Sequence, residues 1–246
     1  MDLHDPYLGI LASTVDDMEG ARIALANRLR QLTRSKEDKD GELRGLGLDP
    51  RSPEVRVVQD LLDATEKIEH QAILKLNRQM RVHPLWKTWA MNQKGIGEKT
   101  LARLLAAIGD PYWNDLHQRP RTVSELWAYC GLHVLPSGAA PKRVKGQTLN
   151  WSQEARKRVF LISESCLKQQ DYYAEVYYES KDKYAESLHP TVCVRCGPEK
   201  KPAQPGSPLS DGHKHARALR IVSKEVLKDL WIAAKDLHKT EQERAA

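Results

Sequence analysis

The sequence has a single phenylalanine, only four cysteines among 246 residues, and no long apolar run. A helix that spans a bilayer needs ~20 consecutive apolar residues, and no stretch of the chain approaches that length. The first ten residues, MDLHDPYLGI, lack the basic region and apolar core of a secretion signal. We therefore expect a cytoplasmic protein with no membrane partner, whose core is built from Leu, Ile, Val, Ala, Trp and Tyr.

Cysteine is too scarce for a disulfide scaffold, so a Cys-x-x-Cys pair in a reducing cell indicates metal or redox chemistry. Charged residues make up 29% of the chain and hydrophobic residues 40%, with a formal net charge of +6 and a sequence pI near 9.1. A chain of this length can bury one large core or two modest ones. Its positive charge favours a polyanionic partner, although basic proteins without one are common.

Two long helical patterns fill the first third of the chain. Apolar residues recur every three or four positions over residues 15–32 and again over residues 58–76, which is the period of an amphipathic helix. Ser52 and Pro53 supply an N-cap and a first-turn proline for the second helix. We expect residues 1–92 to form a long, coiled-coil-like helical hairpin. Its narrow seam leaves two alternatives open, packing within the chain or association into a homo-oligomer.

The rest of the chain is also expected to be mostly α-helical. Helical patterns cover residues 100–108, 122–130 and 152–169, and a final amphipathic helix begins near Lys214. Irregular stretches rich in glycine, proline and bases separate them. After the hairpin we predict two further parts: a helix-hairpin-helix domain at residues 93–182, and a zinc-knuckle-like loop with a last helix that packs on that domain at residues 183–246.

A Gly-Ile-Gly turn precedes the helical pattern of residues 100–108. Glycine permits positive φ and close approach of a partner, and the N–H groups of the following helix can face an anion. The pattern resembles the helix-hairpin-helix motif, which grips a DNA backbone without reading bases. A DNA or RNA phosphate is therefore the expected ligand, with a tight turn that binds nothing as the alternative. The expected contacts are Lys94, Gly95, Ile96, Gly97, Lys99, Thr100 and Arg103.

A second basic cluster spans residues 137–160, where six positive charges oppose one acid, Glu154. On a helix that begins near Ser152, the bases are expected to project beside the preceding loop, while Phe160 turns to the core. Trp151 is expected to pack on its own helix, with stacking on a base as the alternative. The expected nucleic-acid contacts are Lys142, Arg143, Lys145, Arg156 and Lys157.

Cys193 and Cys196 have the spacing of a metal knuckle, because two intervening residues let both sulfurs reach one tetrahedral ion. His213 and His215 follow a loop rich in proline and glycine, and His189 lies four residues before the first cysteine. We expect Cys193, Cys196, His213 and His215 to hold a structural zinc ion, with two reduced loop cysteines as the alternative. The fourth ligand stays open, because residues i and i+2 face apart on a helix.

Three segments in order resemble the carboxy-terminal domain of the insertion-sequence "one-ten" transposases: GIGEKTLARLLAAIGDP, SELWAYCGLHVLPSG and KRVKGQTLNWSQEARKRVFLI. The segment RIALANRLRQL resembles the coiled coil that precedes this domain in the family. The resemblance runs from about residue 12 onward and is weakest over residues 183–212. It implies DNA recombination or transposition, with a structured guide RNA as a further partner.

The resemblance implies that Ser137 is the catalytic serine, because it precedes Gly138 where the family carries a serine that attacks the DNA backbone. It also implies that His215 matches a position near a basic helix, with contact to nucleic acid as the alternative to its role as a zinc ligand. Family members further carry a RuvC-like domain whose four acidic residues hold magnesium, and no such domain fits before Val15. Magnesium is therefore expected only where a partner supplies the acidic site.

Three functions remain open at this point. The first is a serine-dependent DNA transposase or recombinase that uses Ser137 as its nucleophile. The second is a catalytically inactive DNA- or RNA-binding protein that keeps the glycine turn and the basic loop. The third is an interaction scaffold held by the helical hairpin and zinc, whose binding to nucleic acid would be weak.

Overall fold

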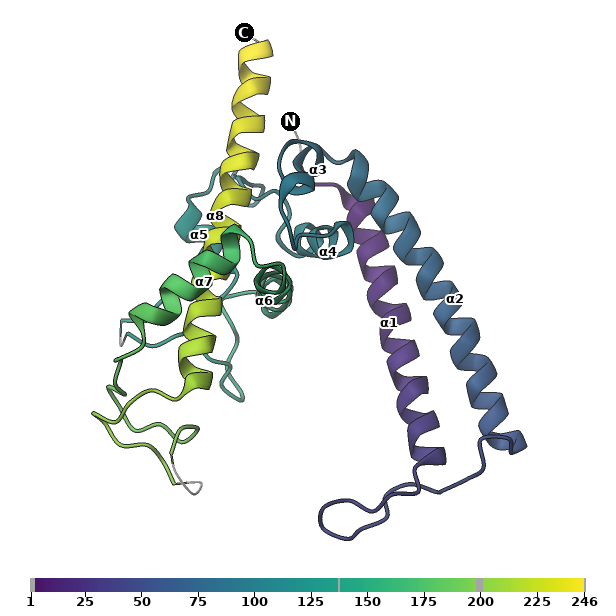
Figure 1. The fold of residues 1–246 in the computed structure, drawn as a ribbon. Helices are drawn as coiled ribbons and strands as arrows, with labels where there is room; N and C mark the ends of the chain where they lie inside the picture. The colour runs from purple at the N-terminus through teal and green to yellow at the C-terminus, as the bar shows by residue number, and fades with distance from the viewer. Residues whose placement is uncertain (1–2, 137, 198–200, 246) are drawn as a thin grey trace.

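The computed structural model describes residues 3–136, 138–197 and 201–245, and it is mostly helical, which confirms the predicted fold class (Figure 1). The described elements are α1 (Pro6–Thr33), α2 (Pro53–Val82), α3 (Pro84–Thr88), the 3-10 turn η1 (Ala90–Asn92), α4 (Glu98–Ile108), β1 (Trp113–Asn114), β2 (Arg119–Pro120), α5 (Val123–Tyr129), α6 (Gln153–Lys168), α7 (Tyr172–Lys183) and α8 (Asp211–Ala245). The two strands pair antiparallel, with Trp113 opposite Pro120. Within these ranges, no helix is long and apolar enough to cross a membrane.

α1 and α2 lie side by side and form one arm of the molecule (Figure 1). Asp5 starts α1, because its carboxylate accepts two backbone N–H groups of the first turn. α2 begins with Pro53 in its first turn, as the sequence predicts. In the half of α2 that is remote from α4, Val55 and Leu62 are the buried apolar residues. The arm therefore depends on its base for most of its packing.

The main core lies where the base of this arm meets α4, α6 and α8. α4 is its centre, and Leu101, Leu104 and Leu105 are almost completely buried there. Val15 of α1 and Leu76 of α2 belong to the same buried cluster. α6 packs against α4 on one side and against α8 on the other. One continuous core therefore joins the first 92 residues to the rest of the chain.

α6 shows how apolar spacing sets the inward face of a helix. Its buried residues form one stripe along the helix: Ala155, Arg158, Val159, Ile162, Ser163 and Cys166. Phe160 was expected in the core, but it is 42% exposed. Each residue turns about 100° around the helix, so Phe160, one step after Val159 and two after Arg158, lies beyond the edge of this stripe. The expectation for Phe160 is therefore wrong.

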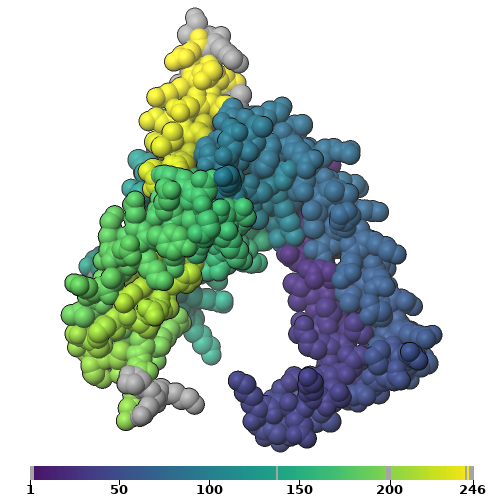
Figure 2. All heavy atoms as spheres, in the orientation of Figure 1, coloured from purple at the N-terminus to yellow at the C-terminus, as the bar shows by residue number. Residues whose placement is uncertain are grey.

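A second arm contains α7, the first half of α8 and the segment that joins them (Figure 1). We call this segment, residues 184–197 and 201–210 of the described chain, the irregular segment. Figure 2 shows the two arms diverging from the shared core, with an opening between them. The loop of residues 131–150 lies beside the first half of α8, because Arg220 donates a hydrogen bond to the carbonyl oxygen of His133 at 2.6 Å. The irregular segment and this loop therefore lie together on one arm.

Candidate metal centre and basic surface

Four side chains from two segments meet at the end of the second arm. His189, Cys193 and Cys196 precede α8, and His213 lies in its first turn. One donor atom from each residue lies within 4.8 Å of the donor atoms of the other three. Metal–ligand bonds of 2.0–2.3 Å place tetrahedral donors about 3.3–3.8 Å apart, and Cys196 Sγ lies 3.3 Å from His213 Nδ1. These four residues, the metal centre, could hold one metal ion.

Backbone pairing brings the ligands of the irregular segment together. The N–H of Cys193 donates to the carbonyl oxygen of Ala203, and the N–H of Ala203 donates back to Cys193, each at 2.9 Å. The N–H of His189 donates to Ser207 at 2.8 Å. The N–H of Cys196 turns back to the carbonyl oxygen of Cys193 at 3.4 Å, which places both thiols on one side of the turn.

His189 supplies the clearest sign that the metal centre fits an ion. The residue is 3% exposed, and its Nε2 atom is buried without a hydrogen-bond partner in the described part of the chain. A buried ring nitrogen that forms no hydrogen bond lowers stability by about 1–3 kcal/mol. Its ring centroid lies 5.3 Å from that of His213. A metal ion bound between these rings would provide the missing partner.

The protonation of the ligands also suits a metal. The backbone N–H of Arg195 lowers the pKa of the Cys193 thiol, which favours the thiolate. Burial, followed by nearby positive charge, lowers the pKa of His213, so its ring is neutral at pH 7. By contrast, burial raises the pKa of Cys130 and of Cys166 to about 12, and these two thiols belong to the core.

The structure brings together three of the four ligands expected from the sequence, Cys193, Cys196 and His213. His215 lies outside the group, and its Nδ1 atom is 2.7 Å from the hydroxyl oxygen of Tyr177. α8 begins at Asp211, so residues 213 and 215 are both helical and face apart. His189 completes the group instead.

Positive side chains surround the metal centre and continue along α8. The charges of Arg217, Arg195 and Lys142 act together with burial to lower the pKa of His213. Burial and Arg156 lower the pKa of Arg220, and burial and Arg220 lower the pKa of Lys224. We call this set the basic surface: Lys142, Arg156, Arg195, Arg217, Arg220 and Lys224. Among the residues that the structure describes, none of the six has a carboxylate within ion-pair distance.

Trp151 and Arg156 fix the end of α6 that carries part of the basic surface. The guanidinium group of Arg156 lies 4.9 Å from the ring centroid of Trp151 and donates to the carbonyl oxygen of Pro141 at 3.0 Å. Gly131, with φ of 65°, allows the ring to pack closely on the backbone, because a Cβ there would lie 2.6 Å from a ring atom. Trp151 therefore packs on its own helix, as expected.

Four other side chains expected to bind nucleic acid, on the loop before α6 and on α6 itself, are exposed. Lys142, Arg143 and Lys145 lie on the loop before α6, and Lys157 projects from α6 with 59% of its side chain accessible. Lys157 lies 3.9 Å from Glu154, so its charge is partly compensated. Ser137 lies outside the described residues.

The Gly-Ile-Gly turn packs against α6. Gly95 has φ of 91°, and a Cβ there would lie 2.5 Å from Cys166 Cα, so only glycine fits. Ile96 is buried. The N–H of Gly97 donates to Thr100 Oγ1 at 3.1 Å, which caps α4. Packing and capping therefore account for the glycine, the isoleucine and the threonine of this turn.

The bases near the turn carry compensated charges. Arg103 is buried and forms ion pairs with Asp16 and Glu19 of α1. Lys99 lies 3.4 Å from Glu19. Lys94 is exposed and lies 3.4 Å from Asp171. These charges are paired with carboxylates of other elements, whereas the six bases of the basic surface have no carboxylate partner among the described residues.

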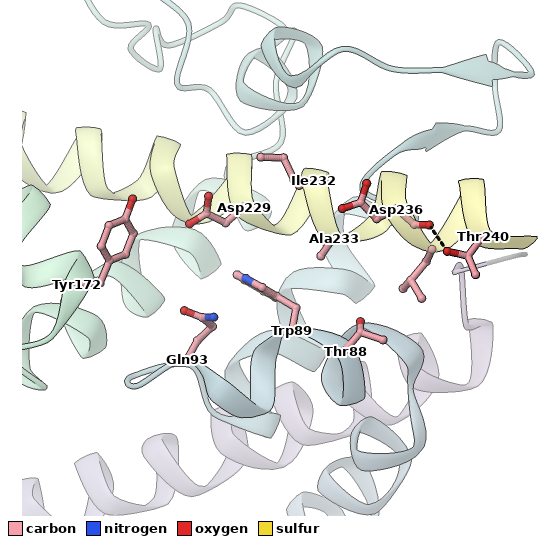
Figure 3. Close-up of a pocket in the computed structure, with 10 residues that line it drawn as sticks. Thr88, Trp89, Gln93, Tyr172, Asp229, Ile232, Ala233, Asp236 and Thr240 are labelled. Carbon is pink, nitrogen blue, oxygen red and sulfur yellow. Dashed lines mark hydrogen bonds between the residues drawn. The ribbon is translucent and has the colours of Figure 1, made fainter.

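A separate pocket of about 620 Å³ lies between α8 and the segment of α3 and η1 (Figure 3). Trp89 and Gln93 face Asp229 across it (Figure 3). Burial raises the pKa of Asp229, which accepts a hydrogen bond from Tyr173 at 2.9 Å. The lining also includes Asp236 and contains no basic side chain. This face of α8 is therefore unsuited to a polyanion.

Comparison of the chain with protein-family models, with curated proteins and with solved structures found no match. The fold and the site together define a mostly helical protein with a group of four residues that could bind a metal ion. This group lies beside positive side chains that have no acidic partner in the described part of the chain.

Proposed function

We propose that the protein binds the phosphate backbone of nucleic acid through the basic surface, as a transposase-like protein that acts on DNA. The observation that carries this proposal is positive charge without acidic partners, gathered from two loops, α6 and α8. Like charges raise each other's free energy, and a phosphate backbone relieves that repulsion while it releases counterions.

The shape of the molecule supports the same proposal. The loop of residues 131–150 projects on the side of the opening between the two arms, so a nucleic-acid backbone can approach it there (Figure 2). The Gly-Ile-Gly turn is a weaker contact, because its neighbours Lys99 and Arg103 are paired with carboxylates. The basic surface is therefore the main contact in this proposal.

We further propose that the catalytic serine, where the protein acts as a transposase, is Ser137. Its hydroxyl oxygen would attack a DNA phosphorus, form a phosphoserine bond and release a deoxyribose oxygen. Within the described residues, the metal centre is the single group of three or more His, Cys, Asp or Glu side chains that could hold an ion. Magnesium for this step would then come from an acidic partner domain.

The same observation favours a second candidate, a nucleic-acid-binding protein without catalysis. Such a protein needs the basic surface but neither Ser137 nor an acidic metal site. The two candidates share every contact with the phosphate backbone, and they differ in covalent chemistry alone.

Zinc is the ion that we propose for the metal centre. Two thiolates and two imidazoles are a common tetrahedral zinc set, and four protein ligands leave no open position for catalysis. The ion would have a structural role and would tie the irregular segment to α8. A reducing cytoplasm would keep both cysteines free of disulfide bonds and able to bind the ion, so we propose that the protein is cytoplasmic.

Binding to duplex DNA and to a structured RNA across a salt series tests the proposal. In the triple variant Lys142→Gln, Arg195→Gln, Arg217→Gln, the slope of log K against log salt should fall by about one per lost phosphate contact. The control Arg56→Gln, Lys67→Gln, Lys75→Gln removes the same charge from exposed positions of α2 and should bind as the wild type does. Equal losses in both variants would show that net charge, and not this surface, determines binding.

Denaturing gels of the same mixtures, run with magnesium, separate the two candidates. A protein–DNA band that resists denaturation, disappears in Ser137→Ala and persists in the control Ser13→Ala establishes the serine enzyme. Salt-dependent binding without such a band establishes the non-catalytic protein. No binding in any mixture excludes both.

A further inference from the structure

The irregular segment that carries three of the four metal ligands has almost no core of its own. Ala203 and Leu209 are its buried apolar residues, and neither belongs to the main core. Val192 and Val194 are 55% and 78% exposed. Two isolated β-bridges do not offset the conformational entropy of ordering such a segment. Its structure therefore depends on a further link, which a metal ion would supply.

The metal ligands and the basic residues alternate along the chain. Arg195 lies between Cys193 and Cys196, and Arg217 lies one helical turn after His213. Ligands that are held in place therefore also hold these two arginines in place. The arginines come from the irregular segment and from α8, which the metal centre and the contact of Cys196 Sγ with Ser210 Oγ at 2.9 Å, directly before α8, bring together, since the β-bridges pair the irregular segment with itself.

Lys142 joins the same region from a different part of the chain. It is exposed on the loop of residues 131–150, directly after Pro141. The loop that carries it is anchored to α6 through Arg156 and to α8 through Arg220. Without the metal centre, Lys142 would keep its place while Arg195 lost a fixed position beside it.

When two cysteine thiols bind a divalent ion they release two protons, so metal loading fixes the positions of the ligands and leaves the net charge of the centre unchanged. Two thiolates offset the charge of a divalent ion such as Zn²⁺, so the loaded centre is neutral overall. Any effect of the metal on phosphate binding would therefore come from the placement of the surrounding bases. This separates the role of this centre from direct attraction between a metal ion and a phosphate.

We infer that metal binding at His189, Cys193, Cys196 and His213 assembles the phosphate-binding surface, so that affinity for a nucleic-acid backbone depends on metal loading. This inference rests on the proposed function, because it adds a regulator to the same surface. Loss of the metal releases Arg195 and loosens the first turn of α8 ahead of Arg217. The main core stays folded, since none of its members lies in the irregular segment.

Metal removal from the full-length wild-type protein is the first test. Metal content, helicity by circular dichroism and affinity for duplex DNA are measured before chelation, after chelation and after zinc is restored. Chelation should leave most of the helicity, weaken binding about tenfold or more at about 0.1 M salt, and make the salt slope shallower by about two. Restored zinc should return both values.

Variants separate metal loading from charge. Cys196→Ser and His189→Asn should lose metal and weaken binding together. Arg195→Gln with Arg217→Gln should keep the metal and weaken binding. The control His117→Asn, at an exposed position between β1 and β2, should keep both. If a ligand variant fails to fold, as its helicity would show, chelation of the wild type gives the same comparison.

The experiments distinguish a failure of the metal-control proposal from a failure of the nucleic-acid-binding proposal. If loaded and stripped protein bind DNA with equal affinity and equal salt slope, metal control is wrong and nucleic-acid binding stands. If neither form binds DNA or RNA, the proposed function fails and the metal control of it fails with it. If the protein as purified and the zinc-treated protein both contain no metal, the metal centre itself is excluded, whatever the binding result.

Discussion

Among individual residues, Arg103 has a structural role that its position beside a glycine turn does not reveal. It is buried and forms ion pairs with Asp16 and Glu19. We expect Arg103→Ala to lower the free energy of unfolding by about 2–3 kcal/mol, because it removes the buried member of two ion pairs and leaves Asp16 with Arg158 and Glu19 with Lys99 alone. The carboxylates are partly exposed, so the loss falls at the lower end for buried pairs.

Urea unfolding measures this loss, and a matched control is Arg81→Ala. Arg81 pairs with Glu98 at 2.8 Å while 63% of its side chain stays exposed, so its removal should cost under about 1 kcal/mol. The salt slope of DNA binding should be unchanged in Arg103→Ala. A shallower slope with unchanged stability would show instead that Arg103 contacts phosphate.

His83 should make stability depend on pH. Its Nδ1 accepts the N–H of Leu85, its Nε2 lies 3.2 Å from the carbonyl oxygen of Leu3, and burial lowers its pKa from the ordinary value of 6.5. The charges of Asp5 and Asp110 act in the opposite direction without overcoming burial. As the pH falls, the unfolded chain therefore binds a proton at His83 before the folded chain does. The contribution of His83 to the free energy of unfolding is fully present above pH 6.5 and is lost as the pH drops toward the lowered pKa of the folded state.

The variant His83→Asn tests this pH dependence, because asparagine can cap α3 but does not titrate. Between about pH 7.5 and pH 5.5, the wild type should lose about 1 kcal/mol more stability than the variant. Chemical denaturation at both pH values gives the comparison. Parallel pH profiles would show that His83 does not titrate in this range.

Local pattern predicted three of the four metal ligands, Cys193, Cys196 and His213, but it could not choose between His189 and His215 for the fourth. Cys193 and Cys196 lie close in sequence, so spacing alone puts both thiols on one ion. The choice of histidine depends on where α8 begins. That start, at Asp211, comes before His213 and turns His215 toward Tyr177.

At the scale of elements, the two glycines of the turn between η1 and α4 differ in how much a side chain would destabilise the fold. Gly95 has a positive φ and packs on Cys166, whereas Gly97 has φ of −95° and has only Thr100 Oγ1 within 4 Å of an added Cβ. We expect Gly95→Ala to lower stability by about 2–4 kcal/mol and Gly97→Ala by less than about 1 kcal/mol. Thermal unfolding of the two variants checks this. Equal losses would mean that α6 does not impose the constraint.

Amphipathic spacing predicted the long helices well, because it determines which face each of them buries. The pattern over residues 152–169 corresponds to α6 (Gln153–Lys168). The sequence analysis missed α7, since no glycine or proline marks the break before it. The break occurs at Gln170, which has φ of 52° without being glycine. The β1–β2 pair was also missed, because its two-residue strands have no period to detect.

At the scale of the whole molecule, contacts between distant segments could not be predicted from local pattern. Asp16 and Arg158 form an ion pair although 142 residues separate them. Arg103 and Arg158 stand in basic clusters of the sequence, and no local pattern indicates the carboxylates that α1 brings to them. The basic surface was likewise incomplete, because Arg217, Arg220 and Lys224 lie far along the chain from Lys142.

These long-range contacts predict how the protein unfolds. Residues 1–92 share one buried cluster with α4, α6 and α8, so we expect one cooperative transition in calorimetry, with equal calorimetric and van't Hoff enthalpies. Amides of α4 and α6 should exchange slowest, and those of α1 and α2 far from α4 should exchange faster because few buried residues hold them there. Asp16→Ala removes ion pairs to α4 and α6 and should lower the melting temperature without splitting the transition. Two separate transitions in the wild type, with the first confined to α1 and α2, would show that the arm folds as an independent unit and that the shared core does not couple it to the basic surface.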